Sequence, residues 1–136
     1  MGSPPTVVDG DSRLELPVSP IAAGVARSFV RDCWSHLESA EILDDVTLCV
    51  SELVTNALDH ALPPFELRVA RQQGWLRVEL ADASAWAPVL RTIAPDMLRG
   101  RGILLVSSVA TRWGVESTNG GKTVWAEFAT NGSANA

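Results

Sequence analysis

The residues SELVTNALDHA, positions 51–61, carry the most information about the architecture. Their apolar members continue a stripe that begins upstream, so the spacing predicts an amphipathic helix over 43–61, which Pro63 ends. Glu52, Asn56 and His60 follow one another at four-residue intervals, which aligns them along a polar stripe beside the apolar one. A carboxylate and a carboxamide aligned in this way suit Mg²⁺, which prefers oxygen ligands. The alternative is an ordinary solvated helix face.

Strands and helices are predicted on both sides of this helix. Alternation predicts an edge strand over 13–18, and Ser19-Pro20 predicts the start of a helix that runs to about residue 37. Two hairpins follow, 65–80 around Gly74 and 113–128 around Asn119-Gly120, with an irregular stretch 83–99 and a helix 102–111 between them. We therefore expect an α/β two-layer sandwich, in which three helices cover one face of a mixed, mostly antiparallel sheet. The open face is expected to carry Trp75 and Trp125 as a partner surface.

Length and composition exclude several functional classes. The 136 residues suffice for one domain, which we place at 13–129 between flexible tails 1–12 and 130–136. Lys and Arg number 11 against 16 Asp and Glu, and this net charge of −5 excludes a nucleic-acid face. No apolar run is long enough for a membrane span, and the first residues lack the basic-then-apolar order of a signal peptide, so we expect a cytoplasmic protein. Cys33 and Cys49 are expected to be reduced, with a disulfide as the alternative.

Asp82 ends the second strand of the first hairpin. It shares the parity of Leu76, Val78 and Leu80, so its side chain is expected on the core side. A carboxylate there needs hydrogen-bond donors, and the exocyclic amine of a bound base would serve. The alternative is an aspartate that starts a turn.

Glycine-rich segments lie further along the chain. Arg99, Gly100, Arg101 and Gly102 precede Ile103 at the start of the predicted helix 102–111. Glycines at a helix N-terminus beside arginines favour phosphate binding, while a plain loop is the alternative. The later segment Gly121-Lys122-Thr123 joins two strands and lacks the spacing of a P-loop, so we reject a Walker motif.

Taken together and in this order, the motifs resemble those of the GHKL (histidine kinase-like) ATPase superfamily. The motifs are Glu52-x3-Asn56, Asp82, Gly100-x-Gly102 and Gly121-Lys122-Thr123. SELVTNALDHA, GRGILLVSSVATRWGV and GGKTVWAEF look most like the small bacterial anti-sigma-factor serine/threonine kinases and their single-domain actinomycete relatives. The resemblance covers nearly all of 13–129 and implies the Bergerat-type ATP-binding fold, which agrees with a two-layer sandwich.

The resemblance also implies roles for individual residues. Asn56 would be the Mg²⁺ ligand, Glu52 the general base, and Asp82 the acceptor for the adenine amine. The segment 99–103 would close over the phosphates. Independently of the resemblance, His60 is expected to be a polar residue at the helix end that also braces the nucleotide site. Thr123 would support Asp82 or the base, although its parity turns it outward. The chain has Asp82-Ala83-Ser84 where family members often have Asp-x-Gly.

The activity that the resemblance implies is transfer of the ATP γ-phosphate, with Mg²⁺, to a serine or threonine of a STAS-like anti-anti-sigma partner. Sequestration of a sigma factor, and thereby regulation of transcription, would accompany it, and a homodimer is a further expectation. Two alternatives stay open. One is an ATP- or ADP-binding module that acts only by sequestering a protein partner, and the other is a domain that binds no nucleotide.

Overall fold

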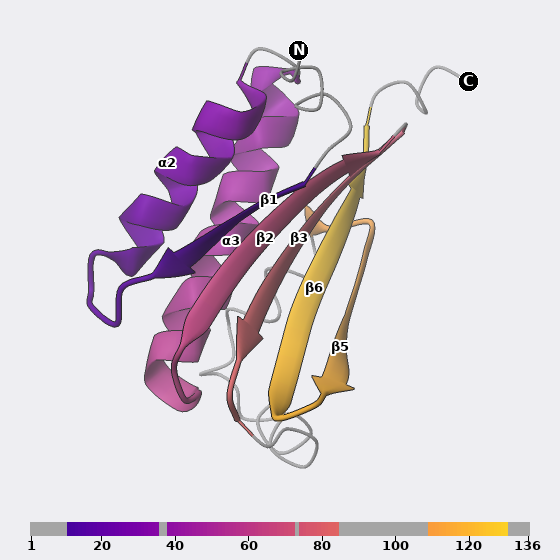
Figure 1. The fold of residues 1–136 in the computed structure, drawn as a ribbon. Helices are drawn as coiled ribbons and strands as arrows, with labels where there is room; N and C mark the ends of the chain where they lie inside the picture. The colour runs from indigo at the N-terminus through magenta and orange to yellow at the C-terminus, as the bar shows by residue number, and fades with distance from the viewer. Residues whose placement is uncertain (1–10, 36–37, 73, 85–108, 131–136) are drawn as a thin grey trace, which may run out of the picture.

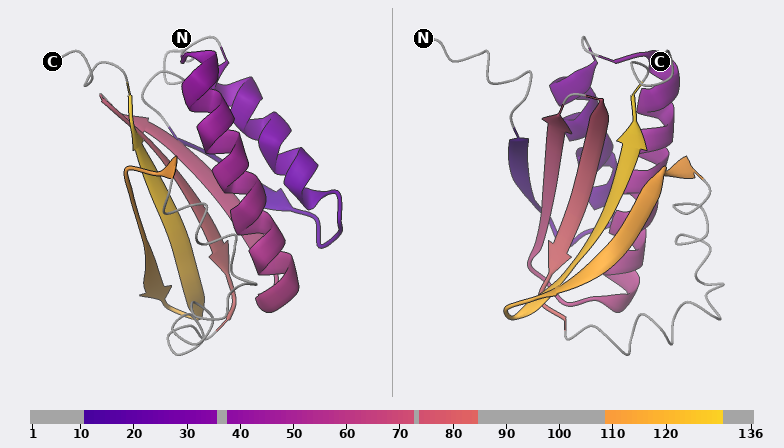
Figure 2. Two further views of the ribbon diagram at one scale, coloured as in Figure 1. Left: turned by 180° about the vertical axis from the view of Figure 1, so that it is seen from behind. Right: turned by 90° about the vertical axis from the view of Figure 1, so that its right-hand side faces the viewer.

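The computed structural model describes residues 11–35, 38–72, 74–84 and 109–130. Five strands form one sheet in the order β1-β2-β3-β6-β5, and both described helices pack against the same face of it (Figure 1; Figure 2). In chain order the elements are β1 (Asp11–Leu16), α2 (Ala22–Trp34), α3 (Ala40–His60), β2 (Phe65–Gln72), β3 (Trp75–Asp82), β5 (Arg112–Thr118) and β6 (Gly121–Ala129). The predicted two-layer sandwich is confirmed. Residues 85–108, with most of the predicted third helix, lie outside the described residues.

Every pairing between the described strands is antiparallel, so the parallel pair expected of a mixed sheet is not found among them. The connection between β1 and β2 explains part of this. Two helices, rather than one, lie between these strands, so the chain returns to the end of the sheet that it left. A single crossover helix would have produced a parallel pair.

The core lies between the inner face of the sheet and the two helices. α3 packs on β3 and β6, while α2 packs on α3 and β1. The strands alternate as predicted, with every second residue of β3 buried. Fully buried side chains come from α3 and from the inner positions of the strands, among them Val46, Val50, Val54, Leu67, Val69, Leu76, Val78 and Leu80.

Both helices begin at other residues than the sequence predicts. α2 begins at Ala22 and not at Pro20, because Ser19 forms a turn first: its hydroxyl accepts from the Ile21 N–H at 3.2 Å. α3 begins at Ala40 and not at residue 43, because the hydroxyl of Ser39 caps it by accepting from the Ile42 N–H. The polar first turn of α3 extends the helix beyond its apolar stripe.

Three smaller expectations can be compared with the structure. Both cysteines are free thiols, as predicted. Asp11 and Ser12 belong to β1 and not to the expected N-terminal tail. Among the described helices, none combines the length and the apolar character that crossing a membrane requires.

Candidate functional site

The candidate site is built around Asp82, the last residue of β3. The sheet register sets Asp82 directly opposite Lys122 on β6. Both side chains lie on the inner face, which α3 covers, and they are nearly buried, with 2% of the Asp82 side chain and 10% of the Lys122 side chain exposed. The inward orientation predicted for Asp82 from its parity is confirmed.

The carboxylate of Asp82 has two hydrogen-bond donors from its own chain. Lys122 Nζ donates to Oδ2 at 2.6 Å, and the backbone N–H of Ser84 donates to Oδ1 at 2.8 Å. The first of these contacts is also an ion pair. The buried carboxylate is therefore compensated in charge before any ligand arrives.

Lys122 is not among the site residues that the sequence predicted, although a signal for it exists. Val124, Ala126 and Phe128 face the core, and Lys122 has the same parity on β6. The same alternation turns Thr123 to the opposite face, where it is paired with Ala81. Lys122, and not Thr123, is thus the β6 side chain that contacts Asp82.

Ser84 connects the site to the end of α3. Its hydroxyl accepts a hydrogen bond from the Leu62 N–H at 2.8 Å, and the Ala83 N–H donates to the Leu62 carbonyl oxygen at 2.9 Å. Ser84 itself is buried. These two bonds join the chain that leaves α3 to the loop that follows Asp82.

The predicted polar stripe lies on the side of α3 that is turned away from α2. On the α2 side, Thr47 and Ser51 accept hydrogen bonds from Arg31 and Arg27 at 3.3 and 2.8 Å. Glu52 and Asn56 lie roughly opposite these residues around the helix. Both are half-buried, whereas His60 at the helix end is exposed.

None of the side chains of Glu52, Asn56 and His60 forms a hydrogen bond or an ion pair with another described residue. Carboxylate and carboxamide oxygens that are half-buried without a partner fit Mg²⁺, which takes oxygen ligands. The described residues hold no cluster of three or more His, Cys, Asp or Glu that could bind a metal ion. A magnesium ion here would therefore depend on water or ligand oxygens, as it commonly does.

Two open hollows lie away from this stripe. One, of about 350 Å³, is bordered by the ends of β2 and β3 and by the turn between β5 and β6. The other, of about 910 Å³, lies along the outer side of α2 beside β1. Glu52, Asn56 and His60 line neither of them. The predicted phosphate segment, Arg99 to Ile103, lies outside the described residues.

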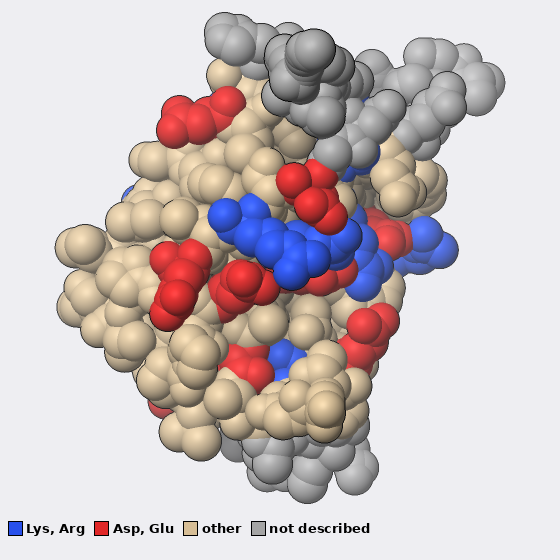
Figure 3. All heavy atoms as spheres, viewed as in Figure 1, with Lys and Arg blue, Asp and Glu red and all other residues tan. Residues whose placement is uncertain are grey.

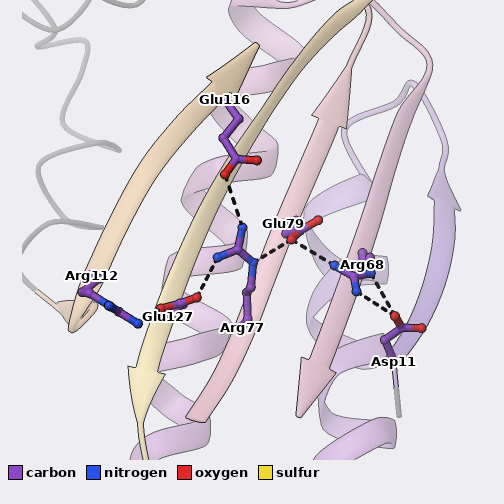
Figure 4. Close-up of polar contacts among 7 residues, drawn as sticks. All are labelled: Asp11, Arg68, Arg77, Glu79, Arg112, Glu116 and Glu127. Atoms are coloured by element: carbon purple, nitrogen blue, oxygen red, sulfur yellow. Dashed lines mark hydrogen bonds and ion pairs between the residues drawn. The ribbon is translucent and has the colours of Figure 1, made fainter. Parts of the chain in front are cut away.

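The open face of the sheet carries a row of charged side chains that we call the ion-pair ladder: Asp11, Arg68, Glu79, Arg77, Glu127, Arg112 and Glu116 (Figure 4). Arginines form a band across this face with carboxylates on either side of it (Figure 3). Trp75 and Trp125 lie on the same face, as predicted. The guanidinium groups of Arg112 and Arg77 stack on them, at 4.7 and 4.4 Å from the ring centres.

The pairing in the ladder changes the acidity of two of its carboxyl groups, those of Glu127 and Asp11. Burial would raise the pKa of Glu127, but hydrogen bonds and charge from Arg77 and Arg112 outweigh it and lower that pKa. The hydrogen bond from Arg68, helped by its charge, lowers the pKa of Asp11. The ladder is thus most favourable when both carboxyl groups are ionised.

Comparison with known proteins adds to this geometry. The family model described as the histidine kinase-like ATPase domain matches residues 16–128. No curated protein matches the chain.

Solved structures are also similar to it, among them the following three. The RsbU and RsbW domains of Rv1364c from Mycobacterium tuberculosis superpose with a TM-score of 0.68 and 16% identity, covering 88% of this chain and 32% of that one. The histidine kinase domain of the Erythrobacter litoralis EL346 blue-light activated histidine kinase superposes with a TM-score of 0.57 and 21% identity, and the match covers 80% of this chain and 59% of that one. A chain of the SiaB-SiaC complex from Pseudomonas aeruginosa superposes with a TM-score of 0.56 and 13% identity, and the match covers 86% of this chain and 88% of that one. The chain thus spans about a third of the first of these proteins and less than two thirds of the second, and identities this low concern the fold alone.

Proposed function

The chain belongs to the histidine kinase-like ATPase family, and from this membership we propose that it binds Mg-ATP on the inner side of the sheet and phosphorylates a serine or threonine of a partner protein. The observation that carries the proposal is the stripe on α3. There Glu52 and Asn56 keep half-buried oxygen atoms without a hydrogen-bond partner among the described residues. The buried carboxylate of Asp82, on the face that α3 covers, supports it.

Each predicted residue except Thr123 has a role in this proposal. Asp82 accepts a hydrogen bond from the adenine amine, and the carboxamide oxygen of Asn56 is a magnesium ligand. Glu52 accepts the proton of the attacking hydroxyl group. His60 braces the nucleotide, and the segment 99–103 closes over its phosphates. When bound, ATP would supply the transferable phosphoryl group and Mg²⁺ would neutralise the charge of the phosphates. The protein would then contribute mainly by positioning the nucleotide and the attacking hydroxyl group.

The proposed substrate is a STAS-like anti-anti-sigma protein, and the proposed second partner is a sigma factor. Two structural neighbours support this choice by their composition: one contains an RsbW domain beside an RsbU domain, and another is SiaB in complex with SiaC. The proposal includes a cytoplasmic location and a homodimer.

A second candidate is a module that binds nucleotide without turning it over and acts by sequestering its partner. Two observations favour it. Lys122 already neutralises Asp82, and Ser84 ties the following loop to Leu62 in a position where relatives often have glycine. Both features restrict movement around Asp82, where the adenine base is proposed to bind.

Nucleotide binding is tested first, by thermal unfolding with and without Mg-ATP. A ligand present at about 100 times its Kd stabilises a protein by about 2.7 kcal/mol, which raises Tm by several degrees for a domain of this size. We expect this shift in the wild-type chain and its loss in Asn56→Ala. The matched control is Thr55→Ala, because Thr55 is exposed on another side of α3. A wild-type chain that shows no shift with ATP, ADP or GTP would contradict the proposal.

Catalysis is tested by phosphate transfer from labelled ATP to candidate anti-anti-sigma proteins. Removing a general base commonly slows a reaction about 10²- to 10⁴-fold, so Glu52→Gln should lose transfer by this factor while still binding ATP. Transfer at the wild-type rate in Glu52→Gln would refute the base assignment. ATP binding with a stable partner complex and no transfer by the wild-type chain would establish the second candidate.

A further inference from the structure

The ion pair between Asp82 and Lys122 has hydrogen-bonding capacity left over. A lysine ammonium has three donors, and among the described residues Asp82 is its one partner. An ionised carboxylate has about four acceptor sites, and Lys122 and Ser84 use two of them. The pair therefore presents free donors next to free acceptors on the inner face of the sheet.

Structural stability alone does not account for this pair. Burying two charges costs free energy that their attraction only partly restores, so a well-packed apolar pair often stabilises a fold as well or better. Lys122 begins the inward-facing row of β6, whose other members, Val124, Ala126 and Phe128, are all apolar. A charged side chain at this position is better explained by a role in ligand binding than by a role in stability.

We propose that Lys122 contacts the nucleotide base: its ammonium donates a hydrogen bond to ring nitrogen N1 of adenine, beside the amine that Asp82 accepts. This inference rests on the proposed function and adds a specificity residue to it. Nζ and Oδ2 lie 2.6 Å apart, so the pair offers one donor and one acceptor side by side. The Watson–Crick edge of adenine offers the complement, an acceptor nitrogen and a donor amine attached to the same ring carbon.

The pair also predicts which bases are rejected. Hypoxanthine, the base of ITP, and guanine carry a carbonyl oxygen in place of the amine and an N–H in place of the acceptor nitrogen. In the same pose, the carbonyl would meet the carboxylate of Asp82 and the N–H would meet the ammonium of Lys122. Sites that hydrogen-bond a ligand reject mismatched analogues strongly, because their own buried groups are then left unpaired. We expect ATP to bind at least about 10²-fold more tightly than ITP or GTP.

The test measures binding of ATP and of 1-deaza-ATP, in which C–H replaces N1, by titration calorimetry. The wild-type chain should bind 1-deaza-ATP about 10- to 100-fold more weakly than ATP. Lys122→Met keeps the length of the side chain and removes its donors, so this variant should bind both nucleotides with equal, reduced affinity. The matched control is Arg71→Met, on β2, in which the preference for ATP should remain at the wild-type ratio.

Because Lys122→Met leaves Asp82 buried without its counter-charge, that variant can fail to fold. The double variant Asp82→Asn/Lys122→Met removes both charges at nearly constant shape and should likewise lose the preference for ATP over 1-deaza-ATP. If a folded variant without the lysine keeps the wild-type preference, Lys122 only neutralises Asp82 and the inference is overturned. The proposed function then stands, because ATP still binds. A wild-type chain that binds no ATP overturns both.

Discussion

A β-carbon on Gly121 would lie 1.9 Å from the backbone carbonyl oxygen of Asp82. The first residue of β6 therefore passes the last residue of β3 at a distance that only glycine permits. The adjacent residue, Lys122, reaches the Asp82 carboxylate because the two strands come this close. Gly121 thus sets the geometry of the ion pair although it has no side chain.

Gly121→Ala should destabilise the chain by about 1–3 kcal/mol, as over-packing at a tight contact does. The neighbouring atoms are backbone atoms of Asp82 and Ala83, which cannot move aside as a flexible side chain can. Urea unfolding monitored by circular dichroism measures the loss. Gly24→Ala is the matched control: Gly24 lies in α2, and the nearest atom to an added β-carbon there is Arg27 Nη2 at 3.6 Å. The control should gain about 0.5–1 kcal/mol, since alanine favours a helix over glycine. Equal stabilities of Gly121→Ala and wild type would contradict the close approach.

Ser84→Ala should cost about 1–3 kcal/mol, because it leaves the Leu62 N–H without its acceptor. Amide hydrogen exchange gives the specific readout. The Leu62 amide should exchange faster in the variant, while amides in the middle of β3 change only in line with global stability. Ser117→Ala, at an exposed position of β5, serves as the control and should leave the Leu62 amide unchanged. Unaltered exchange at Leu62 in Ser84→Ala would mean that the serine does not hold this segment.

The stability of the chain should depend on pH through Glu127. Its pKa is lower in the folded chain than in the unfolded one, so its contribution is complete above the unfolded value, about 4.3, and disappears as pH falls through the folded value. Glu127→Gln should lower the free energy of unfolding at pH 7 by about 1.5–3 kcal/mol, typical for hydrogen bonds to a charged group, and flatten the acid limb of the stability curve. Denaturant unfolding between pH 3 and pH 7 provides the comparison.

Glu116→Gln is the control for this prediction. Glu116 belongs to the same ladder, but it is 3.9 Å from Arg77 and its side chain is 58% exposed. Exposed pairs contribute about 0–1 kcal/mol, so the control should follow the wild-type curve closely. A Glu116→Gln curve as flat as that of Glu127→Gln would assign the pH dependence to the ladder as a whole.

The two cysteines should differ in reactivity. Burial, with a smaller contribution from the charge of Glu52, raises the pKa of Cys49 to about 12, and the side chain has no exposed surface. Cys33 is half-buried, and burial raises its pKa as well. At pH 8, a thiol reagent should label Cys33 slowly and Cys49 only through unfolding, since the thiolate is the reacting form. In denaturant both should react at one rate, and Cys33→Ala should leave a folded chain that resists labelling. Fast labelling of that variant would contradict the burial of Cys49.

Much of this fold could be predicted from the sequence, because the spacing of apolar residues and the residue types at turns depend on residues close together in the chain. The alternation around Gly74, which has a positive φ, and the pair Asn119-Gly120 predict both hairpins. The helix starts were misplaced because the hydroxyls of Ser19 and Ser39 accept hydrogen bonds from the Ile21 and Ile42 N–H groups, and these bonds determine where each first turn begins.

The site was predicted less completely, since its geometry depends on pairs that are far apart in the chain. The parity of β3 was sufficient to turn Asp82 inward, but its partner lies 40 residues away and follows from the β3–β6 register. The tie between Leu62 and Ser84 likewise joins two loops whose proximity no local pattern encodes. Glu52 and Asn56 could be aligned from spacing alone, and their roles stay predictions.

The ladder on the open face also determines how this surface meets other molecules in solution. The ladder contains three arginines and four carboxylates, so its own net charge is −1, whereas the net charge of the whole chain is −5. Opposite charges a few ångströms apart cancel at a distance, so the ladder exerts a weak field beyond the Debye length of about 8 Å at physiological salt. A charged partner approaching the molecule is therefore attracted or repelled mainly by the charges elsewhere. A partner that docked on the ladder would have to break or dehydrate ion pairs that already exist. We therefore expect fast, salt-sensitive association to occur at other surfaces of the molecule.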